Sequence, residues 1–243
     1  MLSTHRRHLT FALAALIAAA VTAGVTACGK GENAQSSSPP VAGKLTVVPT
    51  KPDTTRPASE AGLPRGYHAV FDDASASAAA VTYAEKEPGR WEVKTGPAHI
   101  LYSPGDTAKN RYSVSATFEQ LKAPAHPEAF GVFIGGSSLG DAKVKYTYFI
   151  VRGDGMYMVK VRDGSSTRTI TDWTAQPSIP KQDAAGKGLY GIQIQVRDNA
   201  ASVNVNGVPI TTISGKVAPL NGIAGVRINH NLDLIVTPVS LIR

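Results

Sequence analysis

Three pairs of acidic residues lie close enough in the sequence to act together as an acid and a base, and they are Asp72 with Asp73, Glu85 with Glu87, and Asp154 with Asp163. Cleavage of a glycosidic bond needs two carboxyls roughly 5–10 Å apart, one of them protonated. Adjacent residues of a strand point to opposite faces, so Asp72 and Asp73 would not converge. Glu85 and Glu87 precede Pro88, where solvated charge is the usual interpretation. We therefore expect no catalytic residue among these acids.

Histidine and cysteine, the other residues that bind metals or act as nucleophiles, are few. Beyond residue 28 the histidines stand far apart in the sequence, at His68, His99, His126 and His230. No two of them have the spacing of a metal-binding pair, and no Gly-x-Ser-x-Gly motif occurs. One cysteine excludes an intramolecular disulfide and any site built from several thiols. The sequence therefore predicts no metal site and no cofactor.

That one cysteine, Cys28, follows a segment typical of export. Residues 1–8 hold two arginines and two histidines without an acid, and Leu9 to Val21 is an almost unbroken apolar run. This is the pattern of a secretory signal peptide. The run is too short and too rich in alanine for a spanning helix, which needs about 20 strongly apolar residues. It ends in Val25-Thr26-Ala27-Cys28, which resembles a bacterial lipobox.

The resemblance to a lipobox implies that residues 1–27 are removed and that Cys28 carries a diacylglyceryl thioether, with palmitate among the acyl chains. Two or three acyl chains anchor a protein stably where a single chain binds only marginally. We expect an exported protein held on the outer face of the cell membrane or in the outer membrane. The alternative is an ordinary signal peptide followed by a chance cysteine.

Residues 28–66 form a predicted tether that is rich in Pro, Ser and Thr and has little to bury in a core. At this length its end-to-end reach is on the order of 35 Å. Without residues 1–27, which contain two arginines and no acid, the net charge falls from +7 to +5. This mild excess is not gathered into a patch, so we expect no binding to nucleic acid.

From residue 67 to residue 243 the pattern changes to short runs with alternating apolar and polar residues, separated by Gly, Asp, Asn, Pro and Ser. The predicted strands are 68–72, 79–84, 90–94, 98–102, 111–119, 129–135, 145–152, 156–162, 167–172, 189–197, 201–206, 208–213, 223–229 and 232–242. Sheets with one apolar and one polar face stack in pairs. The predicted fold class is therefore all-β, a two-sheet antiparallel sandwich preceded by the signal peptide and the disordered tether.

Two tight turns and two faces follow from the same pattern. Residues 152–155 (Arg-Gly-Asp-Gly) and Asn206-Gly207 are predicted hairpin turns. The alternation places Tyr112, Val114, Ala116 and Phe118 on one face of their strand. It places Tyr190, Ile192, Ile194 and Val196 on one face of another.

The succession of elements includes Phe130–Gly135, Tyr146–Arg152, the Val203–Val208 hairpin and the segment from Gly222 to Asn231, followed by a last apolar strand. That order resembles the concanavalin A-like lectin/glucanase jelly roll, in particular laminin-G-like and bacterial 3-keto-disaccharide hydrolase-like domains. The resemblance covers residues 67–243. It implies a carbohydrate or polymer site on the concave face of one curved sheet.

The resemblance also bears on catalysis and metals. Hydrolase-like relatives have an acidic residue in the strand that here runs from Tyr146 to Ile150, and this chain has none there. The Glu-x-Asp-x-Glu strand of related glucanases is absent as well, which argues against hydrolysis. Ca²⁺ is implied by family analogy only, because Asp141, Asp154 and Asp163 lack a recognisable ligand spacing.

Sugars bind to aromatic faces and to polar side chains that meet their hydroxyls. Tyr146, Tyr148 and Arg152 share one face of their strand, and Trp173 ends another. The remaining residues of the predicted groove are Gln193, Gln195, Arg227, Asn229 and His230. For each aromatic residue the alternative is packing in the core or its rim. For His230 the alternative is a turn, Asn229-His230-Asn231, that closes a hairpin.

These observations favour a lipid-anchored surface protein whose β-sandwich binds a glycan or a cell-wall polymer without catalysis. One alternative is a glycosidase acting on keto-disaccharides. Another is a structural lipoprotein that binds other proteins of the cell envelope.

Overall fold

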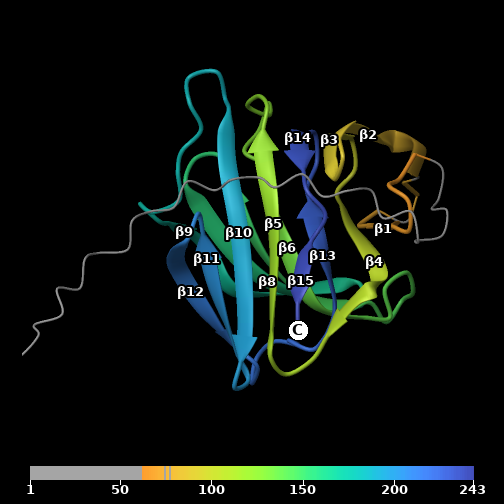
Figure 1. Cartoon of the computed structure of the whole chain (residues 1–243), viewed down its shortest axis with the longest axis vertical. Helices are drawn as coiled ribbons and strands as arrows, with labels where there is room; N and C mark the ends of the chain where they lie inside the picture. Colours follow the sequence, from red (N-terminus) through yellow and green to blue (C-terminus); the bar gives the residue numbers. More distant parts are fainter. Residues whose placement is uncertain (1–61, 74, 77) are drawn as a thin grey trace, which may run out of the picture. The chain divides into compact units, whose positions relative to one another are not determined.

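The computed structural model of the chain describes residues 62–73, 75, 76 and 78–243 (Figure 1). The predicted signal peptide, Cys28 and the tether up to residue 61 lie outside these residues. Leu63, near the end of the predicted tether, is buried in the core. The ring of Tyr67 packs edge-on against Trp91, with 5.2 Å between centroids. Among the described residues no helix is long and apolar enough to cross a bilayer.

The described chain is all-β and forms two antiparallel sheets, as predicted. The first sheet has seven strands, in the order β1 (His68–Phe71), β4 (His99–Ala108), β13 (Gly222–Ile228), β6 (Ala129–Ser137), β7 (Lys145–Arg152), β8 (Met156–Asp163) and β9 (Ser166–Ala175). The second has eight, in the order β12 (Val208–Ser214), β11 (Ala200–Val205), β10 (Gly188–Arg197), β5 (Tyr112–Gln120), β14 (Asp233–Val236), β3 (Arg90–Thr95) and β2 (Val81–Glu87), with β15 (Ser240–Ile242) also pairing with β5. Figure 1 shows β10, β5 and β14 side by side in the second sheet.

The core lies between the sheets and is made by the faces that alternation predicts. The predicted apolar faces of β5 and β10 are buried, and the residues between them are not. Phe118 of β5 stacks on Phe130 of the other sheet at 5.2 Å, and Tyr190 of β10 meets Phe130 edge-on at 5.2 Å. These rings join the two sheets, and burying large aromatic side chains contributes strongly to core stability.

Both predicted hairpin turns are present. Gly155 donates to the carbonyl of Arg152 at 3.1 Å and has a φ of 85°. Asn206 and Gly207 have φ values of 50° and 82°, the left-handed geometry that the tightest hairpin turn requires. The Asn206 side chain also accepts from the backbone of Gly191 at 2.6 Å, which ties the turn to the neighbouring strand.

Four local predictions were wrong. The run 232–242 is two strands, because Pro238 lies between β14 and β15 and proline cannot donate to a ladder. The strand predicted at 98–102 continues to Ala108 through a bulge opposite Ile223 and Gly225. Residues 78–80 form a short 3₁₀ turn before β2 rather than its beginning. The turn at His230 and Asn231 closes no hairpin, since it connects β13 in one sheet to β14 in the other.

Candidate functional site

The seven-stranded sheet has a second apolar cluster on its outer face, the face turned away from the eight-stranded sheet. On β7, Phe149 and Val151 belong to the core between the sheets, whereas Tyr146, Tyr148 and Ile150 belong to this second cluster. The remaining buried members are Ile100, Tyr102, Ala129, Phe133, Val144 and Met158. An antiparallel sheet usually turns a polar face to water. The outer face is therefore a candidate for binding.

An ion pair between a buried arginine and a partly exposed aspartate lies on the outer face. Arg227 of β13 donates from Nη1 to Asp72 Oδ1 at 2.7 Å and from Nη2 to the other carboxylate oxygen. The Arg227 side chain is only 6% exposed, whereas that of Asp72 is 34% exposed. Nε of Arg227 donates to Asn229 Oδ1 at 3.1 Å, and Nη1 reaches the Tyr146 hydroxyl at 3.4 Å. The guanidinium is thus fixed on three sides.

The ion pair determines the charges in this part of the outer face. Burial would raise the pKa of Asp72, but the hydrogen bonds and charge of Arg227, helped by Arg162 and His230, hold it below its usual value. Burial raises the pKa of Tyr148 to about 12, although the charges of Arg227 and Arg162 oppose that rise. The pKa of Tyr146 is likewise raised by burial. At neutral pH this group of five residues therefore has one carboxylate (Asp72), two guanidinium groups (Arg227 and Arg162) and two neutral phenols (Tyr146 and Tyr148).

A cavity of about 550 Å³ opens beside the ion pair. Its walls are residues 69–73 and Ala76, the β6–β7 loop at 140–142 with Val144, Tyr146 of β7, Arg162 of β8 and the turn at Gly164 and Ser165. Two acids that line the cavity, Asp73 and Asp141, accept hydrogen bonds from backbone amides of their own loops. Asp73 accepts from the Ser75 amide at 2.8 Å, and Asp141 accepts from the Lys143 amide at 2.6 Å. The cavity therefore combines apolar walls with a few oriented polar groups, as small-ligand sites do.

Arg152 and Trp173 lie on the outer face but near its other edge, where β9 ends the sheet. The Arg152 guanidinium stacks over the Trp173 ring, with 4.3 Å from Cζ to the centroid, and is also paired with Asp154. Trp173 is partly buried against the apolar cluster. The predicted residues Tyr146, Tyr148, Arg152, Trp173 and Arg227 thus share one face. The cavity reaches Tyr146 but not Arg152 or Trp173.

Gln193 and Gln195 do not belong to this face, contrary to the predicted groove. Both lie on β10 in the eight-stranded sheet, and their neighbours Ile192 and Ile194 point into the core. The two glutamines therefore lie on the far side of the sandwich, where they bond to each other at 3.2 Å. Alternation identified their polar face correctly, but it does not say in which sheet a strand lies.

Asn229 and His230 follow the end of β13, close to the ion pair. Asn229 positions Arg227 through its side chain, and its carbonyl accepts from Thr95 at 2.8 Å. The His230 side chain is 55% exposed, and its Nδ1 lies 3.9 Å from Glu128. Asn229 therefore orients the arginine, while His230 contributes charge near Asp72.

The carboxylates weighed as catalytic pairs each have a partner of their own. Glu85 accepts from the Gly89 amide at 3.0 Å, and Asp163 pairs with Lys145 at 2.8 Å. Asp72 and Asp73 lie in a bend after β1, where the first pairs with Arg227 and the second with Ser75. Within the described residues no group of three or more His, Cys, Asp or Glu side chains is placed to hold a metal ion.

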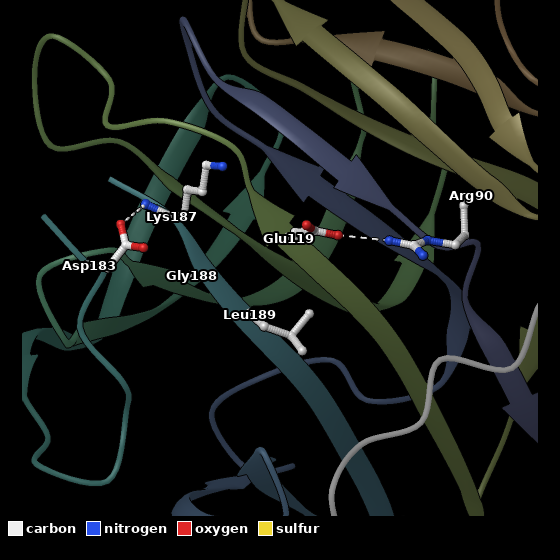
Figure 2. Close-up of a pocket in the computed structure, with 6 residues that line it drawn as sticks. All are labelled: Arg90, Glu119, Asp183, Lys187, Gly188 and Leu189. Carbon is white, nitrogen blue, oxygen red and sulfur yellow. Dashed lines mark hydrogen bonds and ion pairs between the residues drawn. The ribbon is translucent and has the colours of Figure 1, made fainter. Parts of the chain in front are cut away.

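A second cavity, of about 460 Å³, lies on the outer side of the eight-stranded sheet and is lined by Arg90, Glu119, Asp183, Lys187, Gly188 and Leu189 (Figure 2). Arg90 is paired with Glu119 at 2.7 Å, and Asp183 accepts from the Lys187 amide at 2.8 Å. No aromatic side chain lines this cavity. The cavity of the seven-stranded sheet is the better candidate, because Phe71, Tyr146 and Arg162 line it and the Asp72–Arg227 pair lies beside it.

Sequence reasoning missed two residues of the site. Asp72 was weighed only as half of a catalytic pair, and Arg162 was not singled out. Alternation along β8 does provide a signal for Arg162, since Val159 and Val161 are core residues and Arg162 shares the opposite face with Met158. Nothing in the sequence indicates that Asp72 pairs with Arg227, which is 155 residues away.

Comparison with known proteins identifies the fold. No family model and no curated protein matches the sequence. The carbohydrate-binding module CBM66 from Bacillus subtilis superimposes with a TM-score of 0.52 at 9% identity, over 73% of this chain and 96% of that one. A Bacillus subtilis protein of unknown function with a galectin-like fold gives 0.52 at 10% identity, over 72% and 88%. The described domain thus has a two-sheet jelly-roll fold similar to those of these two structures.

Proposed function

We propose that the β-sandwich binds carbohydrate in the cavity on the outer face of its seven-stranded sheet. The observation that supports this most is the Asp72–Arg227 pair beside that cavity, with the Tyr146 hydroxyl within 3.4 Å of the guanidinium. Oriented hydrogen-bonding groups next to aromatic and apolar surface suit the hydroxyls and the apolar faces of a sugar ring. The similar structure from Bacillus subtilis, CBM66, is described as a carbohydrate-binding module, which adds support at the level of the fold.

We propose further that binding is not accompanied by hydrolysis. A glycosidase needs one carboxyl that is protonated near neutral pH. The hydrogen bonds and charge of Arg227 favour the ionised form of Asp72, although its burial opposes this. Asp73 and Asp141, the other acids of the cavity, are exposed and accept hydrogen bonds within their own loops. The expected ligand is a glycan or another polymer of the cell wall.

The test of carbohydrate binding uses residues 28–243 with Cys28→Ala, applied to a glycan array and then titrated by calorimetry. We expect Tyr146→Phe to weaken binding about five- to tenfold, because it removes one oriented hydroxyl and keeps the ring. Gln195→Ala, on the opposite sheet, serves as the matched control and should bind like the parent. Binding lost equally in both variants, or no glycan bound by the parent, would contradict the proposed site. Release of reducing sugar from a bound glycan would instead favour the glycosidase alternative.

We also propose that Cys28 attaches the mature chain to a membrane by a lipid, with residues 28–66 as the tether and residues 67–243 as the binding domain. The support comes from the basic and apolar segments before Val25-Thr26-Ala27-Cys28. A lipid on Cys28 would hold the protein on the outer face of the cell membrane or in the outer membrane. A binding domain on a tether could then reach polymers at some distance from the bilayer.

Substitution of the cysteine tests the anchor. In a bacterial host we expect the full chain to partition into detergent, and its first mature peptide to begin at Cys28 with the added mass of acyl chains. Cys28→Ala should abolish both signals, whereas Ser36→Ala in the tether should leave both unchanged. Detergent partition and mass spectrometry provide the measurements. An exported protein with a free, unmodified thiol would show that residues 1–27 are an ordinary signal peptide.

A further inference from the structure

Two arginines lie at or beside the cavity, and only one of them is paired with an acid. Arg227 is neutralised, because Asp72 accepts from both of its terminal nitrogens. Arg162, which lines the cavity, donates from Nε to the carbonyl of Gly164 at 2.6 Å. Neither terminal nitrogen of Arg162 has a hydrogen-bond or ion-pair partner in the described part of the chain. One guanidinium with its forked end open therefore remains beside a completed ion pair.

A second cation, Lys160, lies on the same strand as Arg162. Lys160 lies two residues before Arg162 on the outward side of β8, opposite Tyr148 of β7, and is half-buried. Its ammonium has no ion-pair partner among residues 62–73, 75, 76 and 78–243. Residues two apart on a strand are about 7 Å apart. Lys160 and Arg162 thus form a short positive row on β8, opposite Tyr148 and Tyr146 of β7.

The acids of this region do not cancel that row. Asp73 and Asp141 are exposed residues at the cavity and are hydrogen-bonded within their own loops. Asp163, after Arg162, pairs with Lys145 at 2.8 Å. Charges exposed to solvent are screened more strongly than partly buried ones. Arg227, Arg162 and Lys160 therefore outnumber Asp72, the one acid paired with them, and Arg162 is the cation of this group that lines the cavity.

We propose that the cavity prefers sugars that bear a carboxylate, such as uronic acids, and that Arg162 recognises this carboxylate. The proposal rests on the carbohydrate-binding function proposed above. The open end of Arg162 presents two parallel N–H groups, which match the two oxygens of a carboxylate. Lys160 adds a point charge further along the strand, where the next acidic unit of an oligomer would lie. Tyr146 and the Asp72–Arg227 pair remain to meet neutral hydroxyls.

The experiment compares each acidic ligand with its neutral form. Trimers of galacturonate and of mannuronate are titrated by calorimetry into residues 28–243 bearing Cys28→Ala, each beside its carboxyl-reduced trimer. We expect one of the uronate trimers to bind at least tenfold more tightly than its reduced form. Arg162→Gln should reduce this preference to threefold or less, and Lys160→Gln should reduce it several-fold. Arg197→Gln, which removes an exposed charge from the opposite sheet, should keep it.

The outcomes separate this inference from the function on which it rests. Equal binding of uronate and reduced trimers, weakened by Tyr146→Phe, would overturn the preference and leave carbohydrate binding intact. Equal loss of preference in Arg162→Gln and Arg197→Gln would overturn the role of Arg162, because general charge would then explain the effect. Absence of binding to any glycan would overturn both proposals. Unfolding midpoints within a few degrees of the parent show that each variant remains folded.

Discussion

Asp72→Ala is expected to lower the free energy of unfolding by about 3 kcal/mol, since it leaves the Arg227 guanidinium almost fully buried without its carboxylate. The value lies at the low end for a broken buried pair, because Asp72 is one-third exposed and water can partly replace it. Arg227→Met should cost less, about 1 kcal/mol, because it removes the buried charge and leaves a carboxylate that water can reach. Urea denaturation at pH 7 measures both.

The neighbouring acid provides the matched control for this prediction. Asp73 is exposed and bonds only within its own turn, to Ser75. Asp73→Ala should therefore change the free energy of unfolding by less than about 1 kcal/mol. The double variant Asp72→Ala/Arg227→Met should be no less stable than Asp72→Ala alone. If Asp72→Ala cost no more than Asp73→Ala, the ion pair would not be a main support of the outer face.

Acidification from pH 6.5 to pH 4 is expected to remove about 3 kcal/mol of stability through His99 alone. His99 is fully buried, and burial lowers its pKa from 6.5 to about 4. Its ring accepts from or donates to the Tyr83 hydroxyl at 2.6 Å, and Nδ1 lies 3.2 Å from the Pro97 carbonyl. The charges of Arg227 and Asp72 act on it in opposite directions.

The sign follows from which state binds the proton. Between pH 6.5 and 4 the unfolded chain protonates His99 while the folded chain does not, so stability falls as pH falls and levels off below about 4. His99→Gln should remove this slope, whereas His126→Gln, at an exposed position, should retain it. Denaturation in urea at pH 7, 5.5 and 4 measures the slope. Arg227 holds the pKa of Asp72 below its usual value, so the stability that Asp72 contributes is lost at a lower pH than that of His99. A slope unchanged in His99→Gln would contradict the assignment.

Much of the fold could be predicted because it depends on local patterns. Alternating apolar residues place β5 and β10 with their correct inner faces, and Asn206-Gly207 predicts its own turn. The errors concerned strand boundaries. One arose where the apolar pattern continued past the end of a strand, as at Pro238, and another where a bulge let a strand continue, as in β4. Which strands are neighbours was beyond these patterns, and so Gln193 and Gln195 were grouped in one groove with residues of the other sheet.

The sequence by itself determined the all-β class, the inner faces of β5 and β10, the two hairpin turns and the lipobox-like segment at Cys28. These features depend on residues within about ten positions of one another. Only the tertiary structure decided that Asp72 meets Arg227, that Arg162 lies nearby with no ion-pair partner among the described residues, and that Trp173 lies at the far edge of the same face. The physical reason is that the site is assembled across strands. Its contacts depend on the order and register of strands far apart in the chain, which short-range propensity and alternation do not encode.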